Sequence, residues 1–152
     1  MSKLKAIATG ATVICSLTVG FIAKWEGKSN KAYLDLVQVP TVCYGTTRNV
    51  TLGDVRTDDE CIALLKAEIG RINTVLTSAT STYLKPNERA AIVSWAYNVG
   101  DGNMLRSTLL RKVKAGDIQG ACNELTRWVY AGGRKVRGLV NRREAERKLC
   151  LG

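Results

Sequence analysis

The sequence contains no histidine, only two prolines and a single phenylalanine among its 152 residues. Without histidine, a Ser-His-Asp triad or a Cys-His pair cannot form, and a zinc site is unfavourable. A glycine-rich phosphate loop, an internal repeat and a low-complexity segment are also missing, and the turn at Asp101-Gly102-Asn103 lacks the further ligands of a calcium loop. The sequence therefore predicts a protein that uses neither a metal nor a cofactor.

Acidic residues are scarce as well, with 13 Asp+Glu against 23 Lys+Arg and a net charge of +10. Such an excess indicates a polyanionic partner, which could be nucleic acid, an anionic membrane or the cell wall, although the charge could also serve solubility alone. Nucleic acid is disfavoured because the chain lacks the interleaved aromatic residues of a strand-binding surface. The length fits one domain, or two small lobes that share a core.

The N-terminus contains an uncharged run between two groups of lysines. Lys3 and Lys5 precede the eighteen residues 6–23, and Lys24 ends the run. At helical rise the run extends ~27 Å, just enough to cross a bilayer core. Ten of its residues are Ala, Gly, Ser or Thr, so a span this weak could enter a membrane and also leave it. A cleaved signal peptide, a buried first helix and a permanent anchor are the alternatives that the residues leave open.

Three polar residues in the stretch after this run are the candidate catalytic residues. The apolar run places Glu26 in the last turn of a helix, and the alternation from Tyr33 to Tyr44, interrupted at Pro40, predicts a β-hairpin that carries Asp35 and Thr41. Two carboxyl groups that face each other across a cleft are the minimal equipment for cleaving a glycosidic bond.

The spacing Glu-x8-Asp-x5-Thr, set within Trp25-Glu26-Gly27 and Tyr44-Gly45-Thr46, resembles the catalytic signature of the phage-type lysozymes. The resemblance covers residues 17–152 and continues in Tyr97-Asn98-Val99-Gly100, Ser107-Thr108-Leu109-Leu110-Arg111 and Arg142-Arg143-Glu144. In its last hundred residues the chain is similar to the signal-arrest-release (SAR) endolysins of lambdoid phages. The resemblance implies an α+β, mostly helical fold, with a small β-hairpin lobe and a larger helical lobe.

The same resemblance implies an activity and a set of roles. The substrate is peptidoglycan, cut at the β-1,4 link between N-acetylmuramic acid and N-acetylglucosamine. Glu26, beside Trp25, is expected to be the general acid, since partial burial favours its protonated form. Asp35 and Thr41 would hold a water for an inverting displacement, with the carboxyls ~6.5–9.5 Å apart. Arg142 would orient Glu26, and three further residues would bind saccharide: Tyr97, Asn98 and Ser107.

The resemblance also favours a fourth role for the N-terminus, a releasable anchor. Residues 1–23 form the signal-arrest-release segment in this interpretation, and they overlap a catalytic domain over residues 17–152. The N-terminus stays cytoplasmic and the enzyme faces the periplasm, attached to the inner membrane until it is released as a soluble monomer. While Leu17, Phe21 and Ile22 lie in lipid they cannot pack on the enzyme, so we expect the attached form to be inactive.

Five cysteines allow bridges if the chain is exported, and the four beyond the span can pair in three ways. We favour Cys122 with Cys150, tying the last two helices, and Cys43 with Cys61, joining the hairpin to the following helix. The fifth, Cys15, is either a small buried hydrophobe or a thiol that attacks a bridge involving Cys43.

Helix signals divide the remaining residues. A capping box at residues 57–60 opens a helix to Leu76, and Pro86 opens a second that ends near Gly100. Trp95 is expected in the core. Residues 100–103 are predicted as a turn, 104–115 as a helix, 117–128 as a helix capped by Asp117, 131–133 as a loop, and about 139–149 as the last helix.

Two rival functions remain open at this point. A lytic transglycosylase would use Glu26 alone and release a 1,6-anhydro product, but the presence of Asp35 and Thr41 argues against it. A non-enzymatic, membrane-tethered basic binding protein is the second rival.

Overall fold

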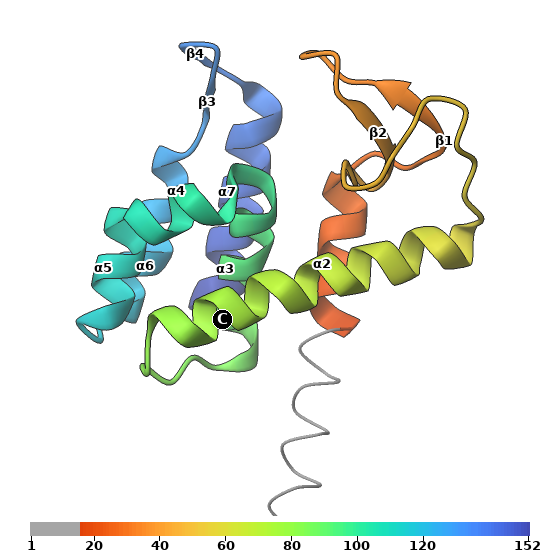
Figure 1. Cartoon of the computed structure of the whole chain (residues 1–152). Helices are drawn as coiled ribbons and strands as arrows, with labels where there is room; N and C mark the ends of the chain where they lie inside the picture. The colour runs from red at the N-terminus through yellow and green to blue at the C-terminus, as the bar shows by residue number, and fades with distance from the viewer. Residues whose placement is uncertain (1–15) are drawn as a thin grey trace, which may run out of the picture.

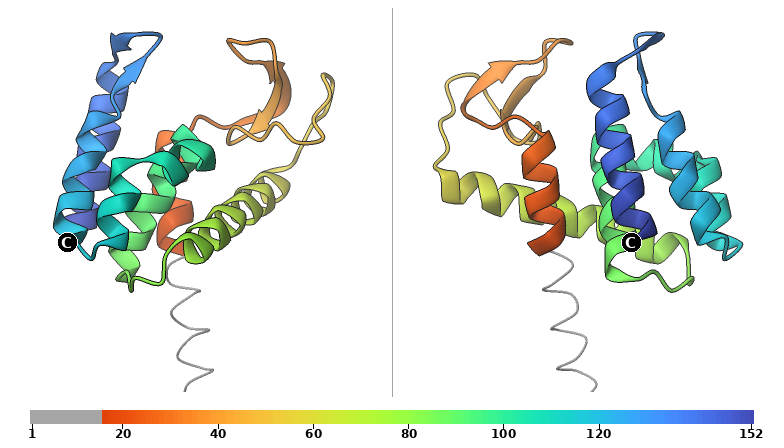
Figure 2. Two further views of the ribbon diagram at one scale, coloured as in Figure 1. Left: turned by 60° about the vertical axis from the view of Figure 1, so that its left-hand side comes forward. Right: turned by 180° about the vertical axis from the view of Figure 1, so that it is seen from behind.

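One long helix, α2 (Asp58–Ala79), connects the two parts of the molecule (Figure 1). The computed structural model describes residues 16–152. At one end of α2 lies a small lobe built on a β-hairpin, and at the other end lies a larger lobe of packed helices (Figures 1 and 2). This confirms the α+β, mostly helical architecture that the sequence predicts. The capping box at the start of α2 is present, with Thr57 and Glu60 bonding to each other's backbone N–H groups.

The hairpin pairs β1 (Ser29–Leu34) with β2 (Pro40–Cys43) in antiparallel register, Tyr33 opposite Thr41. The first strand therefore begins before Tyr33, and residues 35–39, which the alternation placed in the body of the hairpin, form its turn. Gln38 in this turn has a positive φ of 63°. The polar segment that follows holds two isolated β-bridges, Lys31 with Val55 and Val42 with Thr46, and forms no further strand.

The helical lobe is assembled around α3 (Pro86–Val99), which buries seven consecutive residues, 90–96, and is contacted along its length by α7 (Arg137–Leu151). A helix that is buried all round lies in the centre of its lobe. Trp95 is fully buried on α3, as expected, and its ring meets Trp128 edge to face at 5.3 Å between centroids.

The segment between α3 and α7 differs from the prediction in three places. The expected turn at residues 100–103 opens a short helix, α4 (Asp101–Arg106), and Ser107 ends it and caps α5 (Thr108–Lys114). The single helix predicted over residues 104–115 is therefore wrong. Asp117 caps α6 (Ile118–Glu124) as predicted, but α6 ends at Glu124, short of the expected Trp128, and the 3-10 turn η1 (Leu125–Arg127) follows.

The expected loop at residues 131–133 is the turn of a second small hairpin, β3 (Tyr130–Ala131) with β4 (Arg134–Lys135). Two consecutive glycines with positive φ make this tight turn possible. In all three views the two hairpins project from the same end of the molecule (Figures 1 and 2).

Residues 16–25 are helical and lead into the stretch that carries Glu26 (Figure 1). Ile22 is fully buried in the core of the helical lobe. Leu17, expected to be buried with it, is 38% exposed. Within residues 16–152 no helix is long and apolar enough to cross a membrane. Most of the predicted span, residues 6–15, and with it Cys15, lies outside the described residues.

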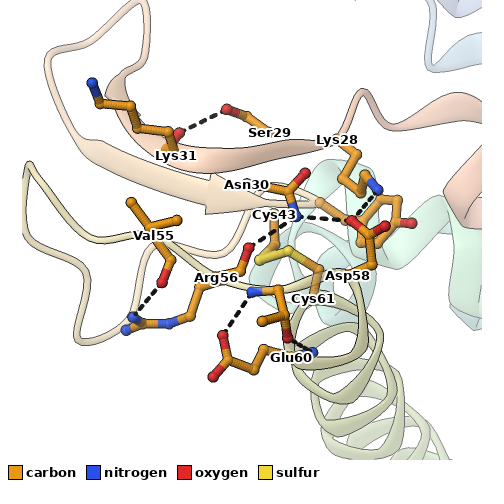
Figure 3. The surroundings of a disulfide bond; sticks show 12 residues. Lys28, Ser29, Asn30, Lys31, Cys43, Val55, Arg56, Asp58, Glu60 and Cys61 are labelled. Atoms are coloured by element: carbon orange, nitrogen blue, oxygen red, sulfur yellow. Dashed lines mark hydrogen bonds and ion pairs between the residues drawn. A yellow bond between two sulfur atoms is a disulfide. The ribbon is translucent and has the colours of Figure 1, made fainter.

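Both favoured disulfides are present. Cys122–Cys150 joins α6 to α7, and Cys43–Cys61 joins the hairpin to α2. Beside the second bridge, Lys28 Nζ lies 2.5 Å from Asp58 Oδ1, and Asn30 donates to the same oxygen at 2.9 Å (Figure 3). The base of the hairpin is thus fixed to the first turn of α2 by a covalent bond and two polar contacts.

Candidate active site

Glu26 follows directly on the N-terminal helical segment, and its backbone N–H still donates to the carbonyl of Ile22 at 2.9 Å. Its side chain is 22% exposed, and its Oε1 lies 2.6 Å from Nη1 of Arg142 on α7. The predicted partnership of Glu26 with Arg142 is therefore present, between residues 116 positions apart in the chain. The carboxylate meets solvent on one side and a buried cation on the other.

All three nitrogens of the Arg142 guanidinium are engaged. Besides the contact with Glu26, Nε donates to Glu146 Oε1 at 3.1 Å and Nη2 donates to the carbonyl of Ser94 at 3.2 Å. The arginine side chain is only 5% exposed. Because a guanidinium is planar and its donors are fixed in direction, these contacts define the position of the nitrogen that faces Glu26.

The charged cluster that holds Arg142 is not apparent from the sequence. Glu146 is fully buried, accepts from the Ser94 hydroxyl at 2.8 Å, and has its second oxygen 2.8 Å from Arg143 Nη1 in an ion pair. Arg143 Nη2 in turn donates to Oδ1 of Asn98. The spacing of these residues on α7, one helical turn apart, was the available signal, but a charged run on a helix is more often a solvated face.

Burial and charge act against each other in this cluster. Removal from water raises the pKa of Glu146, while Arg143 and Arg142 pull it down. Burial lowers the pKa of Arg143 to about 10, opposed by the charge of Glu146. On balance the pKa of Glu146 is raised, because the effect of burial is larger than that of the two arginines.

Asp35 and Thr41 occupy the hairpin, and the backbone of Val39 connects them. Asp35 Oδ1 accepts from the N–H groups of Val37 and Val39 at 2.9 and 2.8 Å, and Thr41 Oγ1 donates to the carbonyl of Val39 at 3.0 Å. Thr41 is buried and Asp35 is half-buried. Within residues 16–152, neither side chain forms a hydrogen bond or ion pair with Glu26.

A pocket of about 330 Å³ lies where the loop after the hairpin, α2 and α3 meet. Tyr97 lines it, and the tyrosine hydroxyl donates to the carbonyl of Tyr44, which connects α3 to the small lobe. Burial raises the pKa of Tyr97, so the phenol stays protonated and remains a donor. Arg71 lines the same pocket and pairs with Glu68 at 2.6 Å and with Asp101 at 3.1 Å.

The other two predicted saccharide ligands are engaged by the protein. Asn98 is exposed and accepts from Arg143 through its side-chain oxygen. The Ser107 hydroxyl donates to the carbonyl of Met104 at 2.7 Å and accepts from the N–H of Leu110 at 3.0 Å. Saccharide binding by Ser107 stays a prediction, but its one proton is used by the backbone in this conformation.

Comparison with known proteins identifies a family and a fold. The family model described as phage lysozyme matches residues 23–146. The SAR-endolysin of Bacteriophage PS119 is 42% identical over 154 residues, which cover 99% of this chain and 92% of that protein. The muramidase domain of SpmX from Asticaccaulis excentricus has a TM-score of 0.83 at 26% identity, covering 89% of this chain and 95% of that one.

Two structures of the P1 phage endolysin Lyz differ clearly in their structural similarity to this chain. The active form has a TM-score of 0.81 at 26% identity and covers 95% of this chain and 93% of that one. The secreted inactive form has a TM-score of 0.55 at 26% identity and covers 68% and 74%. The conformation of residues 16–152 is thus closer to the active form of that protein.

Proposed function

The chain belongs to the phage lysozyme family, and from this premise we propose that it is a muramidase endolysin. Its substrate is bacterial peptidoglycan, cut at the β-1,4 bond between N-acetylmuramic acid and N-acetylglucosamine. The observation that carries the proposal is the 2.6 Å contact between the half-buried Glu26 and the buried Arg142. It fixes one carboxyl group at the surface of the helical lobe, and the hairpin supplies a second.

In the proposed reaction Glu26 gives its proton to the glycosidic oxygen as that oxygen leaves the anomeric carbon. A water held by Asp35 and Thr41 attacks the same carbon from the opposite face of the ring, and Asp35 takes the proton that the water loses. Asp35 Oδ1 is used by the turn, so we assign the water to Oδ2. The net charge of +10 favours approach to a polymer that carries peptide carboxylates.

We further propose that residues 1–23 are a releasable membrane anchor that overlaps the catalytic domain, residues 17–152. Two observations support this. The matched relative is named a SAR-endolysin, and Ile22, four residues before Glu26, is fully buried in the lobe that carries Arg142. If Ile22 were drawn into lipid, the helix that ends at Glu26 would lose its place against that lobe, and the periplasmic enzyme would be inactive until released.

Glu26→Gln tests the reaction. We expect purified Glu26→Gln to lose ~10²–10⁴-fold in hydrolysis of peptidoglycan, because an amide cannot supply the proton. Glu144→Gln, on the exposed side of α7, is the matched control and should keep wild-type activity. Products with free reducing ends support hydrolysis, whereas 1,6-anhydro ends or a fully active Glu26→Gln would contradict the proposal.

The anchor is tested by separating membrane and soluble fractions of cells that express the whole chain, before and after depolarisation. We expect protein in both fractions but lytic activity in the soluble fraction alone. Full activity in the membrane-attached protein would rule out tethering as the inactivating step.

A further inference from the structure

Glu146 has no part in the reaction proposed above, yet it is one of the most buried charged groups of the chain. Its side chain is 0% exposed on α7, between two arginines that are themselves buried. One carboxylate oxygen contacts Arg142 at 3.1 Å and the Ser94 hydroxyl at 2.8 Å, and the other lies 2.8 Å from Arg143. Burying a carboxylate costs free energy, so the presence of Glu146 at this position suggests that it has a role.

The net charge of this cluster determines the electrostatic environment of Glu26. Arg142 and Arg143 contribute two positive charges behind the catalytic carboxyl, and Glu146 contributes one negative charge, which leaves a net of one positive charge. Without Glu146, both cations would face Glu26 with no other buried anion among the residues that contact them. A carboxyl group next to two uncompensated cations gives up its proton readily and takes one back reluctantly.

We propose that Glu146 is a positioning residue that offsets the paired arginines of α7, so that Glu26 can be protonated and act as a general acid. The inference rests on the proposed function and adds a regulating group to the same site. Ser94 has a supporting part, because its hydroxyl holds Glu146 and its carbonyl holds Arg142. The Glu26 carboxyl thus meets Arg142 directly, while Glu146 acts on it through that arginine.

Other charged groups also surround Glu26 and are left unchanged by the test below. Lys24 and Lys28 belong to its own segment, and Tyr97 on α3 interacts with its charge but remains protonated. Asp35 is the group we place opposite it on the hairpin. The cluster on α7 is the part of this environment in which one substitution changes the buried charge without touching the reacting groups.

The test compares pH–rate profiles of peptidoglycan hydrolysis for wild type and three variants. Glu146→Gln raises the charge behind Glu26, so the alkaline limb, where the acid loses its proton, should move to lower pH by about one unit. Arg143→Gln removes a cation and should move the limb to higher pH. The double variant, Arg143→Gln with Glu146→Gln, restores the net charge, and its limb should return to the wild-type position.

The opposite signs separate this role from a merely structural one. A residue needed only for packing would lower the melting temperature and the amount of active enzyme, but would leave the alkaline limb of the folded fraction in place. Glu144→Gln is the control, since Glu144 lies on the same helix, is 42% exposed and pairs with Arg147 across one turn. It should change neither the limb nor the rate.

If Glu146→Gln does not fold, Arg143→Gln and the charge-balanced double variant still test the sign. An unmoved limb in the folded variants, or a shift in the same direction for Glu146→Gln and Arg143→Gln, would overturn the inference. Failure of the proposed function is distinguishable, because wild type and Glu144→Gln would then show no hydrolysis at all, or Glu26→Gln would keep it.

Discussion

The two carboxyl groups of the candidate site are held in different ways. Glu26 belongs to the helical lobe, where its partner Arg142 is fixed by Ser94 on α3 and by Glu146 on α7 itself. Asp35 belongs to the hairpin lobe, where two backbone N–H groups within four residues hold its carboxylate. One group is therefore oriented by distant buried charges, and the other by its own turn.

This difference follows from the environment of each lobe. A hairpin of two short strands has little interior, so its functional residues are positioned by local backbone bonds and by attachment to α2. The helical lobe has a large core, in which a charged cluster can be shielded from water and its contacts strengthened. We therefore expect substitutions in the helical half to disturb distant residues, and substitutions in the hairpin half to act locally.

The largest expected effect comes from Arg142→Lys. A lysine keeps the charge, but a single Nζ cannot contact Glu26, Glu146 and the Ser94 carbonyl together. We expect a loss of about 3 kcal/mol in the free energy of unfolding, measured by urea denaturation, together with a clear fall in hydrolysis. Arg147→Lys, at a partly exposed position of the same helix where the arginine contacts Glu144 and Asn123, should cost less, about 0.5 kcal/mol. Equal effects for both would mean that the buried contacts of Arg142 have no special role in the helical lobe.

Removing each disulfide sharpens the comparison. The bridges close segments of 18 and 28 residues, so Cys43→Ala/Cys61→Ala and Cys122→Ala/Cys150→Ala should each cost ~2–4 kcal/mol. Only the first pair should lower hydrolysis by the protein that remains folded, because Cys43 follows Thr41 by two residues on β2. A similar loss of specific activity in both double variants would show that the hairpin bridge has no separate role.

The smallest expected difference in stability is between two substitutions of Asp35, one that keeps the shape of the side chain and one that does not. Asp35→Asn retains an oxygen that can accept from Val37 and Val39, whereas Asp35→Ala does not. Both variants should be inactive for lack of the base, but the alanine variant should be less stable than the asparagine variant by about 1 kcal/mol. Equal thermal midpoints would mean that the carboxylate does not hold the turn.

Several features could be predicted from the sequence because their causes are local. The capping box at Thr57, the helix that begins at Pro86 and the cap at Asp117 each depend on residues within one turn. The hairpin was found, but its first strand was placed too late, since alternation cannot show that Asp35 captures two backbone N–H groups and ends the strand. The break at Ser107 was missed for the same reason.

The buried cluster could not be predicted from residues alone. Neither Ser94 on an apolar helix nor Glu146 on a charged helix belongs to a motif that sets it apart in the sequence. Both became meaningful only when α3 packed against α7 and turned that face inward. The pairing of Glu26 with Arg142 was expected from family resemblance, whereas the residues that hold Arg142 in place were not.

The order of residues alone determined where Glu26, Asp35 and Thr41 stand in the chain, and which helices could form, because hydrogen bonds and periodicity act over a few positions. The packing of α3 against α7 decided which charges lost contact with water. Whether a carboxylate is a surface group or a buried counter-charge depends on what covers it, and the covering residues of Glu146 lie on a helix some fifty positions away in the chain.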